Sequence, residues 1–259
     1  MESIRYYVEQ IPSIIQLIKD RNISLPDLDG YSFVGSGNAF QVARLYAKHF
    51  NGYAYLSEEI DSIKNKDQVC VISASGGKDS IKVVESFKSP FLLTCNPKAK
   101  AKSIAGETIV VPSLEEPPFY NVTSYAAMIY LISKSNLEIP KRDNNLISLL
   151  NSPSIIFVSD LKNHPIASMC SLKFREILGS LSISLSINEA YHGWFLRPFT
   201  REAVISMNVD FDLKSTYKIC GNSLDILANI YYHIGILQEE LQIKDFEYTK
   251  IIEKREWEI

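Results

Sequence analysis

The sequence predicts an α/β fold in which parallel β-sheets are flanked by helices. Apolar runs such as Val-Cys-Val-Ile at 69–72 lack polar alternation, which is typical of strands buried on both faces of a parallel sheet. Segments with apolar side chains at helical spacing lie between these runs, and such alternation indicates a parallel sheet. The alternation starts again in the second half of the 259-residue chain, so we expect two α/β halves.

The first half opens with a helix over residues 2–22, whose apolar side chains recur at helical spacing before the polar stop Asp20-Arg21-Asn22. A second helix is expected at 38–50, because it is followed by the stop signal Asn51-Gly52. Two further helices are expected, one that begins near residue 79 and one over residues 118–134. The expected strands of this half are 31–34, 54–56, 69–72, 91–94 and 108–111.

The second half follows a predicted linker at 136–153, which contains Pro140 and the polar run 141–145. Its expected helices are one that carries Lys173 and Glu176 and one at 225–241, and its expected strands are 154–158, 183–187, 204–207 and 217–220. We therefore divide the chain into residues 1–138 and 139–259.

The bulk composition limits the classes of partner. The formal net charge is −3, from 27 basic and 30 acidic residues, which gives no general attraction to nucleic acid or to a membrane surface. No apolar run is long enough to span a bilayer, and the N-terminal residues lack a signal-peptide pattern, so we expect a cytoplasmic protein. The four cysteines are scattered without a close pair, which predicts buried free thiols rather than a zinc site: Cys70, Cys95, Cys170 and Cys220.

A loop of serines and glycines, Ser-Ala-Ser-Gly-Gly-Lys-Asp-Ser at 73–80, follows the strand at 69–72 and precedes a helix. Glycines allow close approach of the backbone, and a helix N-terminus attracts anions, so we expect a phosphate site here. A nucleotide P-loop is excluded because Ile72 and Asp79 stand where that motif needs glycine and Ser or Thr. The candidate phosphate-binding residues in this loop are Ser73, Ser75, Gly76, Gly77, Lys78 and Ser80.

A second glycine turn follows the first strand. Its residues Gly35, Ser36, Gly37 and Asn38 lie between the strand at 31–34 and the helix at 38–50. The turn lacks the third glycine of a dinucleotide fingerprint, so we count it as a further candidate substrate contact only.

Three residues of the second half could handle protons: Lys173, Glu176 and His192. Lys173 and Glu176 are three positions apart on one helix face, an arrangement that usually gives a solvated ion pair. His192 lies on a separate segment, which we expect to be a polar loop.

These segments together resemble the sugar isomerase (SIS) domain family. The resemblance rests on GSGNA at 35–39, the loop at 73–80, LKFRE at 172–176 and EAYHG at 189–193, and it extends over nearly the whole chain. Within this family, the chain is similar to the isomerase part of glucosamine-6-phosphate synthase and to bifunctional phosphoglucose/phosphomannose isomerases. The resemblance implies two consecutive SIS domains, each a flavodoxin-like three-layer sandwich, at 1–138 and 139–259.

The resemblance also implies roles for single residues. The family grips its sugar phosphate with S-x-S-G-x-T, which Ser73, Ser75 and Gly76 match, whereas Lys78 replaces the threonine. Glu176 would be the base that moves a proton between C1 and C2, with Lys173 as a cationic group of the catalytic set. His192 would assist ring opening from the neighbouring subunit of a homodimer. A lysine near the C-terminus would close the site, and Lys250 fits this role best, with Lys254 as the alternative.

The implied function is cofactor-free aldose–ketose isomerisation of a hexose 6-phosphate, namely glucose, mannose, fructose or glucosamine 6-phosphate. Proton transfer through an enediolate needs a base, an acid and cationic groups, and it needs no metal or redox cofactor. Two alternatives stay open at this point: an amino-sugar phosphate deaminase or deglycase that uses the same residues, and a non-catalytic protein that only binds sugar phosphates.

Overall fold

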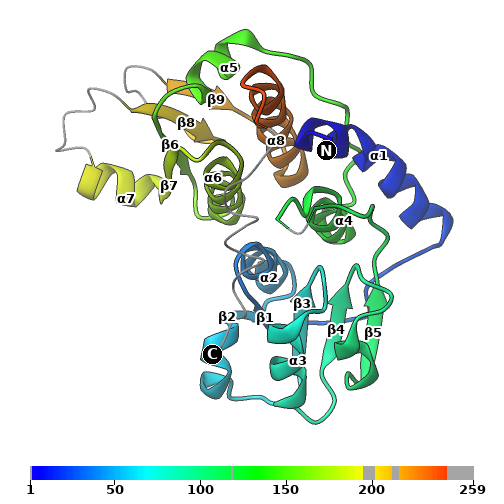
Figure 1. Ribbon diagram of the computed structural model, residues 1–259. Coiled ribbons are helices and arrows are strands. Elements are labelled where there is room, and N and C mark those ends of the chain that lie inside the picture. Colours follow the sequence, from blue (N-terminus) through cyan, green and yellow to red (C-terminus); the bar gives the residue numbers. More distant parts are fainter. Residues whose placement is uncertain (1, 118, 195–201, 212–215, 244–259) are drawn as a thin grey trace. The chain divides into compact units, whose positions relative to one another are not determined.

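The computed structural model describes residues 2–117, 119–194, 202–211 and 216–243, which form two compact units (Figure 1). The first-sheet unit comprises Gln10–Glu138 and Asn222–Asp225, and the second-sheet unit comprises Met1–Glu9, Ile139–Gly221 and Ile226–Ile259. Helix α1 (Ile4–Asp20) therefore contributes residues to both units. The division into two consecutive domains, 1–138 and 139–259, stays a prediction.

The first-sheet unit contains a five-stranded sheet of order β2-β1-β3-β4-β5, in which every neighbouring pair is parallel. This confirms the parallel α/β arrangement that the apolar runs predict. The strands are β1 (Ser32–Gly35), β2 (Tyr53–Leu56), β3 (Val69–Ser73), β4 (Phe91–Thr94) and β5 (Glu107–Val110). The helices are α2 (Asn38–His49), η1 (Ser57–Ser62), α3 (Lys78–Glu85), η2 (Lys100–Ser103) and α4 (Val122–Ser133).

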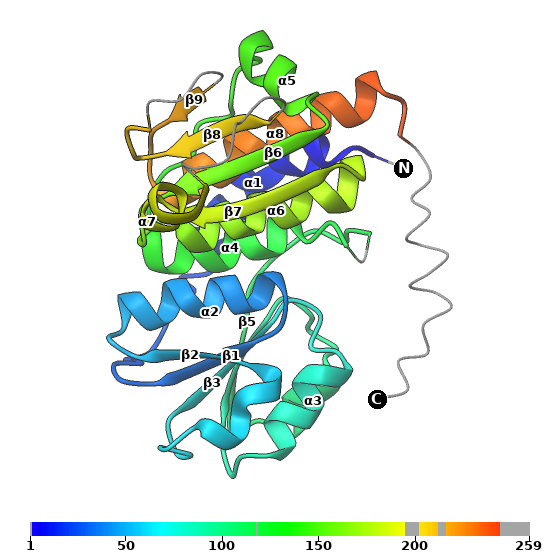
Figure 2. The same cartoon turned by 90° about the vertical axis from the view of Figure 1, so that its left-hand side faces the viewer.

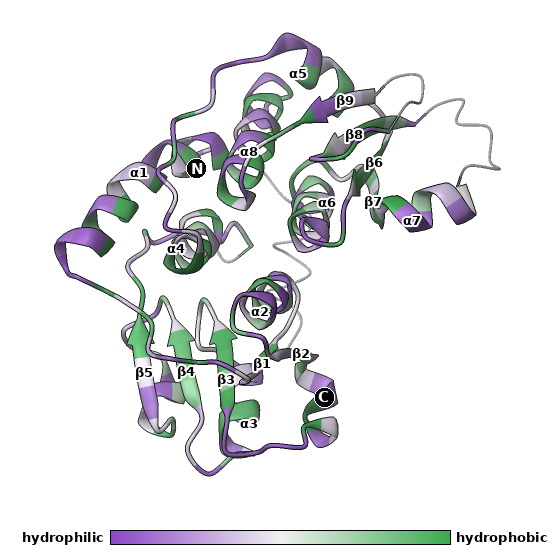
Figure 3. Cartoon of the chain, turned by 180° about the vertical axis from the view of Figure 1, so that it is seen from behind, coloured by the Kyte–Doolittle hydropathy of each residue, from purple (hydrophilic) through white to green (hydrophobic). Residues whose placement is uncertain are grey.

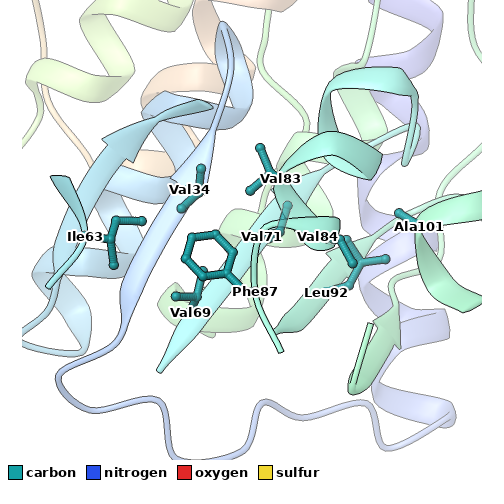
Figure 4. Close-up of a cluster of buried hydrophobic side chains, with 9 residues drawn as sticks. All are labelled: Val34, Ile63, Val69, Val71, Val83, Val84, Phe87, Leu92 and Ala101. Atoms are coloured by element: carbon teal, nitrogen blue, oxygen red, sulfur yellow. The ribbon is translucent and has the colours of Figure 1, made fainter. Parts of the chain in front are cut away.

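The two faces of this sheet have separate cores. On one face, Val83 and Val84 of α3 pack with Phe87 against apolar side chains of the strands (Figure 4). On the other face, Phe33 of β1 contacts Tyr46 of α2 edge-on, with ring centroids 5.8 Å apart. Burial on both faces explains why strands β3 and β4 are strongly hydrophobic along their length (Figure 3).

The second-sheet unit contains a four-stranded parallel sheet of order β7-β6-β8-β9. Its strands are β6 (Ser154–Ser159), β7 (Leu181–Ser186), β8 (Ala203–Met207) and β9 (Thr216–Ile219). Its helical segments are α5 (Asn144–Leu150), α6 (His164–Leu178), α7 (Ile187–Glu189), the π-turn η3 (Ala190–Trp194) and α8 (Ser223–Glu240).

Helix α6 packs along β6 and β7 (Figure 2). Phe157 of β6 meets Phe174 of α6 edge-on at 6.4 Å between ring centroids. Two hydroxyl pairs join α6 to β7, Ser171 with Ser182 at 2.6 Å and Ser168 with Ser184 at 3.0 Å. These hydrogen bonds satisfy the hydroxyls of a buried and of a half-buried serine pair between strand and helix.

The predicted polar linker at 136–153 is wrong in part, because it contains helix α5. The Asp143 side chain caps this helix by accepting hydrogen bonds from the backbone N–H groups of Asn145 and Leu146, at 2.8 and 3.3 Å. The helix buries Leu146, Ile147 and Leu150. The polar run thus ends in an N-cap and an amphipathic turn rather than continuing as a linker.

The predictions for the cysteines and for the His192 segment also need correction. All four cysteines are free thiols, but Cys220 is exposed because it follows β9, and Cys95 is half-buried beyond the end of β4. Cys70 and Cys170 are buried as predicted. The expected polar loop around His192 is a helical turn, since it lies within η3 directly after α7.

Residues near the start of α1 pack in the second-sheet unit against the end of α8. The backbone N–H of Ile4 donates to Gln238 Oε1 at 3.0 Å, and Arg5 pairs with Glu239 at 3.1 Å. A Cβ at Gly235 would lie 2.3 Å from the Arg5 backbone nitrogen, so the close approach of the two helices requires glycine there. Among the described residues, no helix has both the length and the apolar character needed to cross a membrane.

Candidate functional site

The two predicted substrate loops follow adjacent strands of the first sheet. The chain passes from β1 to the outer strand β2 and then back across β1 to β3, so the strand order reverses between β1 and β3. Parallel sheets bind ligands at the carboxyl ends of the strands beside such a reversal. Gly35 ends β1 and Ser73 ends β3, and the two strands pair in register. The structure therefore brings both loops to one edge of the sheet.

The serine–glycine loop, residues 73–80, is held in a tight turn by its own hydrogen bonds. Ser73 Oγ accepts from the backbone N–H of Gly76 at 3.1 Å, which leaves its hydroxyl proton to point elsewhere. Ser80 is buried and donates to the Gly77 carbonyl at 2.6 Å, so its hydroxyl proton is used within the loop. Ser75 and Lys78 are exposed.

Residues that follow β4 in the chain contact this loop and hold its backbone in place. The Ala74 carbonyl accepts from the Cys95 backbone N–H at 3.0 Å, and the Asn96 side chain donates to the Ser75 carbonyl at 2.8 Å. Gly76 has a φ of +60°, and a Cβ there would lie 2.3 Å from the Ala99 Cβ. The turn thus requires glycine for both backbone conformation and space.

The N-termini of α3 and α4 differ in how they are capped. Gly77 precedes α3 and provides no side-chain cap, although Asp79 places a carboxylate in the first turn of that helix. The Glu116 carboxylate caps α4 by accepting from the Val122 and Thr123 backbone N–H groups, the latter at 2.7 Å, and from the Thr123 hydroxyl. Burial raises the pKa of Glu116, while these hydrogen bonds lower it.

The turn after β1 shows a similar dependence on glycine. A Cβ at Gly35 would lie 2.6 Å from the Ala39 backbone, and Gly37 has a φ of +55°. The Ser36 hydroxyl meets the Ser57 hydroxyl at 2.6 Å. Asn38 is 7 % exposed, and its Oδ1 has no hydrogen-bond partner among the described residues. A buried acceptor without a donor is unusual and is commonly satisfied by a ligand or an ordered water.

In the second-sheet unit, α6 places Lys173 beside Glu176. The Lys173 Nζ lies 2.6 Å from Glu176 Oε2. The expected solvated pair is wrong in one respect: the Lys173 side chain is 1 % exposed, whereas that of Glu176 is 26 % exposed. Lysine is buried because α6 is covered by β6 and β7 on one side and contacts α8 through Tyr231. The pair thus joins a buried ammonium to a carboxylate that is partly exposed to solvent.

The remaining predicted catalytic residues are less closely placed. His192 is exposed on η3, an element separate from α6, and it makes no hydrogen bond or ion pair with Glu176. A capping box starts this segment, since Ser186 and Glu189 exchange hydrogen bonds at 2.7 and 3.3 Å. Lys250 and Lys254 lie outside the described residues.

Sequence reasoning missed several residues that shape these sites. Asn96 and Glu116 brace the carboxyl edge of the first sheet, and Tyr231 contacts Lys173. The Glu116-to-Thr123 spacing carries no standard capping signature, because the cap comes from the loop six residues before the helix. Asn96 before Pro97 is a turn signal that could have been noticed.

No protein-family model and no curated protein sequence matches this chain. Solved structures do share its fold. A candidate phosphosugar isomerase from Clostridium difficile 630 superposes with a TM-score of 0.71 at 12% identity, over 97% of this chain and 98% of that chain. The C-terminal domain of glucosamine-fructose-6-phosphate aminotransferase from Francisella tularensis gives 0.68 at 12% identity, over 93% and 94%. Glucosamine-6-phosphate deaminase from Thermotoga maritima gives 0.67 at 12% identity, over 92% and 93%. The chain therefore has the α/β fold of these phosphosugar proteins.

Proposed function

We propose that this protein is a cofactor-free aldose–ketose isomerase of a hexose 6-phosphate. In this proposal, Glu176 removes the proton from the carbon next to the carbonyl and returns it to the neighbouring carbon through an enediolate. Lys173 contributes positive charge beside the base, and His192 protonates the ring oxygen when the sugar opens. Lys250 closes the site, with Lys254 as the alternative, and the protein acts as a homodimer in which His192 serves the neighbouring subunit.

The observation that carries this proposal is the ion pair on α6. A general base needs a fixed orientation, and the Lys173 Nζ lies 2.6 Å from Glu176 Oε2, so the ion pair holds this carboxylate in place. The exposed fraction of the Glu176 side chain leaves the carboxylate open to a ligand, while Lys173 is closed off from water. An ion pair that served only the surface of a helix would have both groups in solvent.

The serine–glycine loop supports a phosphorylated substrate. The N-terminus of α3 has no side-chain cap, and the charges of Lys78 and Asp79 in its first turn offset each other, so the uncapped helix end itself favours a phosphate. At α4 the corresponding place is taken by the Glu116 carboxylate. The helix start at α3 is thus open to a phosphate and that at α4 is not, so we propose that Ser73, Ser75 and the Gly77 amide bind it, while Gly76 shapes the turn.

The test is proton NMR in deuterated water with a panel of hexose 6-phosphates that includes glucosamine 6-phosphate. We expect deuterium to appear at C1 or C2 together with conversion of aldose to ketose for one member of the panel. Glu176→Gln should slow this exchange by about a hundredfold to ten-thousandfold, the usual contribution of a positioned general base. Sugar-phosphate affinity should stay close to that of the wild type.

Glu240→Gln is a matched control. It breaks an ion pair of the same length, 2.6 Å to Arg142, in the same unit, but with both side chains well exposed. This variant should keep full activity. An active Glu176→Gln protein would remove Glu176 from the mechanism.

Deamination of an amino-sugar phosphate is the second candidate, and the shared fold of the Thermotoga maritima glucosamine-6-phosphate deaminase favours keeping it. The same residues could pass through an enolate while the C–N bond breaks. Release of ammonia from glucosamine 6-phosphate in the same tubes would select it. Binding shifts without any exchange or ammonia would indicate a sugar-phosphate-binding protein without catalysis.

A further inference from the structure

The ammonium of Lys173 is held in a place from which water is excluded. The residue is 0 % exposed, and a charged group in such a place is stable only when other groups replace its hydration. Glu176 Oε2 replaces part of it at 2.6 Å. One carboxylate oxygen cannot surround an ammonium that has three donors, so the remaining neighbours decide where Nζ sits.

Tyr231 of α8 is such a neighbour. The Lys173 Nζ lies 5.9 Å from the centre of its ring, within the range in which a cation is attracted to the negative face of an aromatic ring. The ring is 1 % exposed, so water does not weaken this attraction. The Tyr231 hydroxyl also donates to the Met169 carbonyl at 3.4 Å, one helical turn before Lys173. The ring and the hydroxyl of Tyr231 thus both contact α6, and the hydroxyl contact is the weaker one because 3.4 Å is long for a hydrogen bond.

We infer that Tyr231 is a positioning residue, which confines the Lys173 ammonium against Glu176 and so fixes the orientation of the carboxylate. This inference rests on the proposed function for its catalytic meaning, because the carboxylate it orients is the proposed base. The contact itself is a property of the second-sheet unit and can be measured without any substrate. An ordinary core tyrosine would contribute its size alone, whereas this role depends on the charge distribution of the ring.

The test replaces Tyr231 with phenylalanine carrying zero, one, two or three ring fluorines. Fluorine withdraws electron density from the ring face and hardly changes its size, so the attraction for a cation weakens stepwise while packing is kept. The substrate-free readout is the exchange of the Lys173 ammonium protons with water, followed by nitrogen-15 NMR of the lysine side chain. We expect Tyr231→Phe to match the wild type, and exchange to quicken with each fluorine.

Tyr231→Leu removes the ring face altogether, and we expect ammonium exchange about ten- to thirtyfold faster. If this variant does not fold, the fluorinated series still decides the question. The matched control is Tyr232→Leu. This neighbour is also buried on α8, but its ring contacts His233 instead of Lys173, so ammonium exchange should stay unchanged.

The activity arm uses the same proteins with the sugar that the panel identifies. With the carboxylate less well held, kcat should fall several-fold in Tyr231→Leu while KM stays close to the wild-type value. Tyr231→Phe and Tyr232→Leu should keep both wild-type values. A general loss of stability would instead lower the amount of folded enzyme, and Tyr232→Leu would show it as well.

The outcomes separate the two proposals. Ammonium exchange that ignores ring fluorination, or that changes equally in Tyr231→Leu and Tyr232→Leu, overturns the role of Tyr231. Exchange that follows fluorination in a protein that isomerises none of the sugars supports the positioning of Lys173 while the proposed function fails. If ammonium exchange and isomerase activity change together, the result supports both the role of Tyr231 and the proposed function.

Discussion

Replacing Gly76 with alanine should damage the serine–glycine loop more than any other small substitution in it. Gly76 has a φ of +60°, which costs a residue with a Cβ about 1 to 2 kcal/mol. The new Cβ would also stand 2.3 Å from the Ala99 Cβ, and this methyl belongs to a short side chain that cannot turn away. Overpacking of that kind costs about 1 to 3 kcal/mol. The two effects together predict a loss of about 2 to 5 kcal/mol.

Two other glycines of the first-sheet unit separate these effects. Gly30→Ala, in the same unit, has the strained backbone alone, since its φ is +72° and no atom lies within 4 Å of the added Cβ. It should cost about 1 to 2 kcal/mol. Gly77→Ala has an extended φ of −77°, and the added Cβ meets only the Ser75 Oγ, at 3.2 Å. This hydroxyl can rotate, so we expect a cost under about 1 kcal/mol.

The assay is urea denaturation followed by circular dichroism, with the free energy of unfolding taken from the transition of the first-sheet unit. Binding of inorganic phosphate is titrated on the same proteins. Gly76→Ala should lose phosphate affinity as well as stability, because the shift away from Ala99 moves the amides of the loop. If Gly76→Ala is no less stable than Gly30→Ala, the contact with Ala99 does not constrain the turn, and the reasoning is refuted.

Two further predictions concern the second-sheet unit and the assembly. His233 accepts a hydrogen bond from the Asp143 backbone N–H at 2.8 Å, and burial lowers the pKa of its imidazole. The contribution of the neutral imidazole to the free energy of unfolding should therefore be fully present above about pH 6.5 and be lost as the pH falls below that value. The urea midpoint should therefore be lower at pH 5 than at pH 8, and His233→Gln should reduce this difference; equal pH dependence in both proteins would contradict it. Mixing Glu176→Gln and His192→Asn proteins, each inactive alone, should restore about a quarter of wild-type activity if dimers share their sites. No restoration after subunit exchange would mean that each chain supplies both residues to its own site.

Much of the fold could be predicted from the sequence because buried parallel strands leave an unmistakable apolar run. The runs at 69–72 and 91–94 match β3 and β4 closely, since both faces of these strands are covered and each position must be apolar. Helix α5 was missed because its signal is a single aspartate cap followed by seven residues. A helix that short depends on tertiary packing rather than on its own propensity.

The candidate site was predictable only where backbone geometry decides it. The serine–glycine loop needs glycines at defined positions, and these are visible in the sequence. The burial of Lys173 was not predictable, because a lysine three residues before a glutamate has the same pattern on a solvated helix. Its surroundings include Tyr231, which lies 58 positions further along the chain. Contacts of this range leave no trace in local spacing.

The second-sheet unit also has an unusual order of assembly during synthesis. Residues 4 and 5 are made more than two hundred residues before their partners Gln238 and Glu239 emerge from the ribosome. The strands of the first sheet end at Val110, so this sheet can form while the chain is still growing. The start of α1 must wait for α8, because Ile4 is fully buried and its backbone N–H bonds to Gln238. A nascent chain stalled before α8 would thus present an apolar helix end that chaperones recognise.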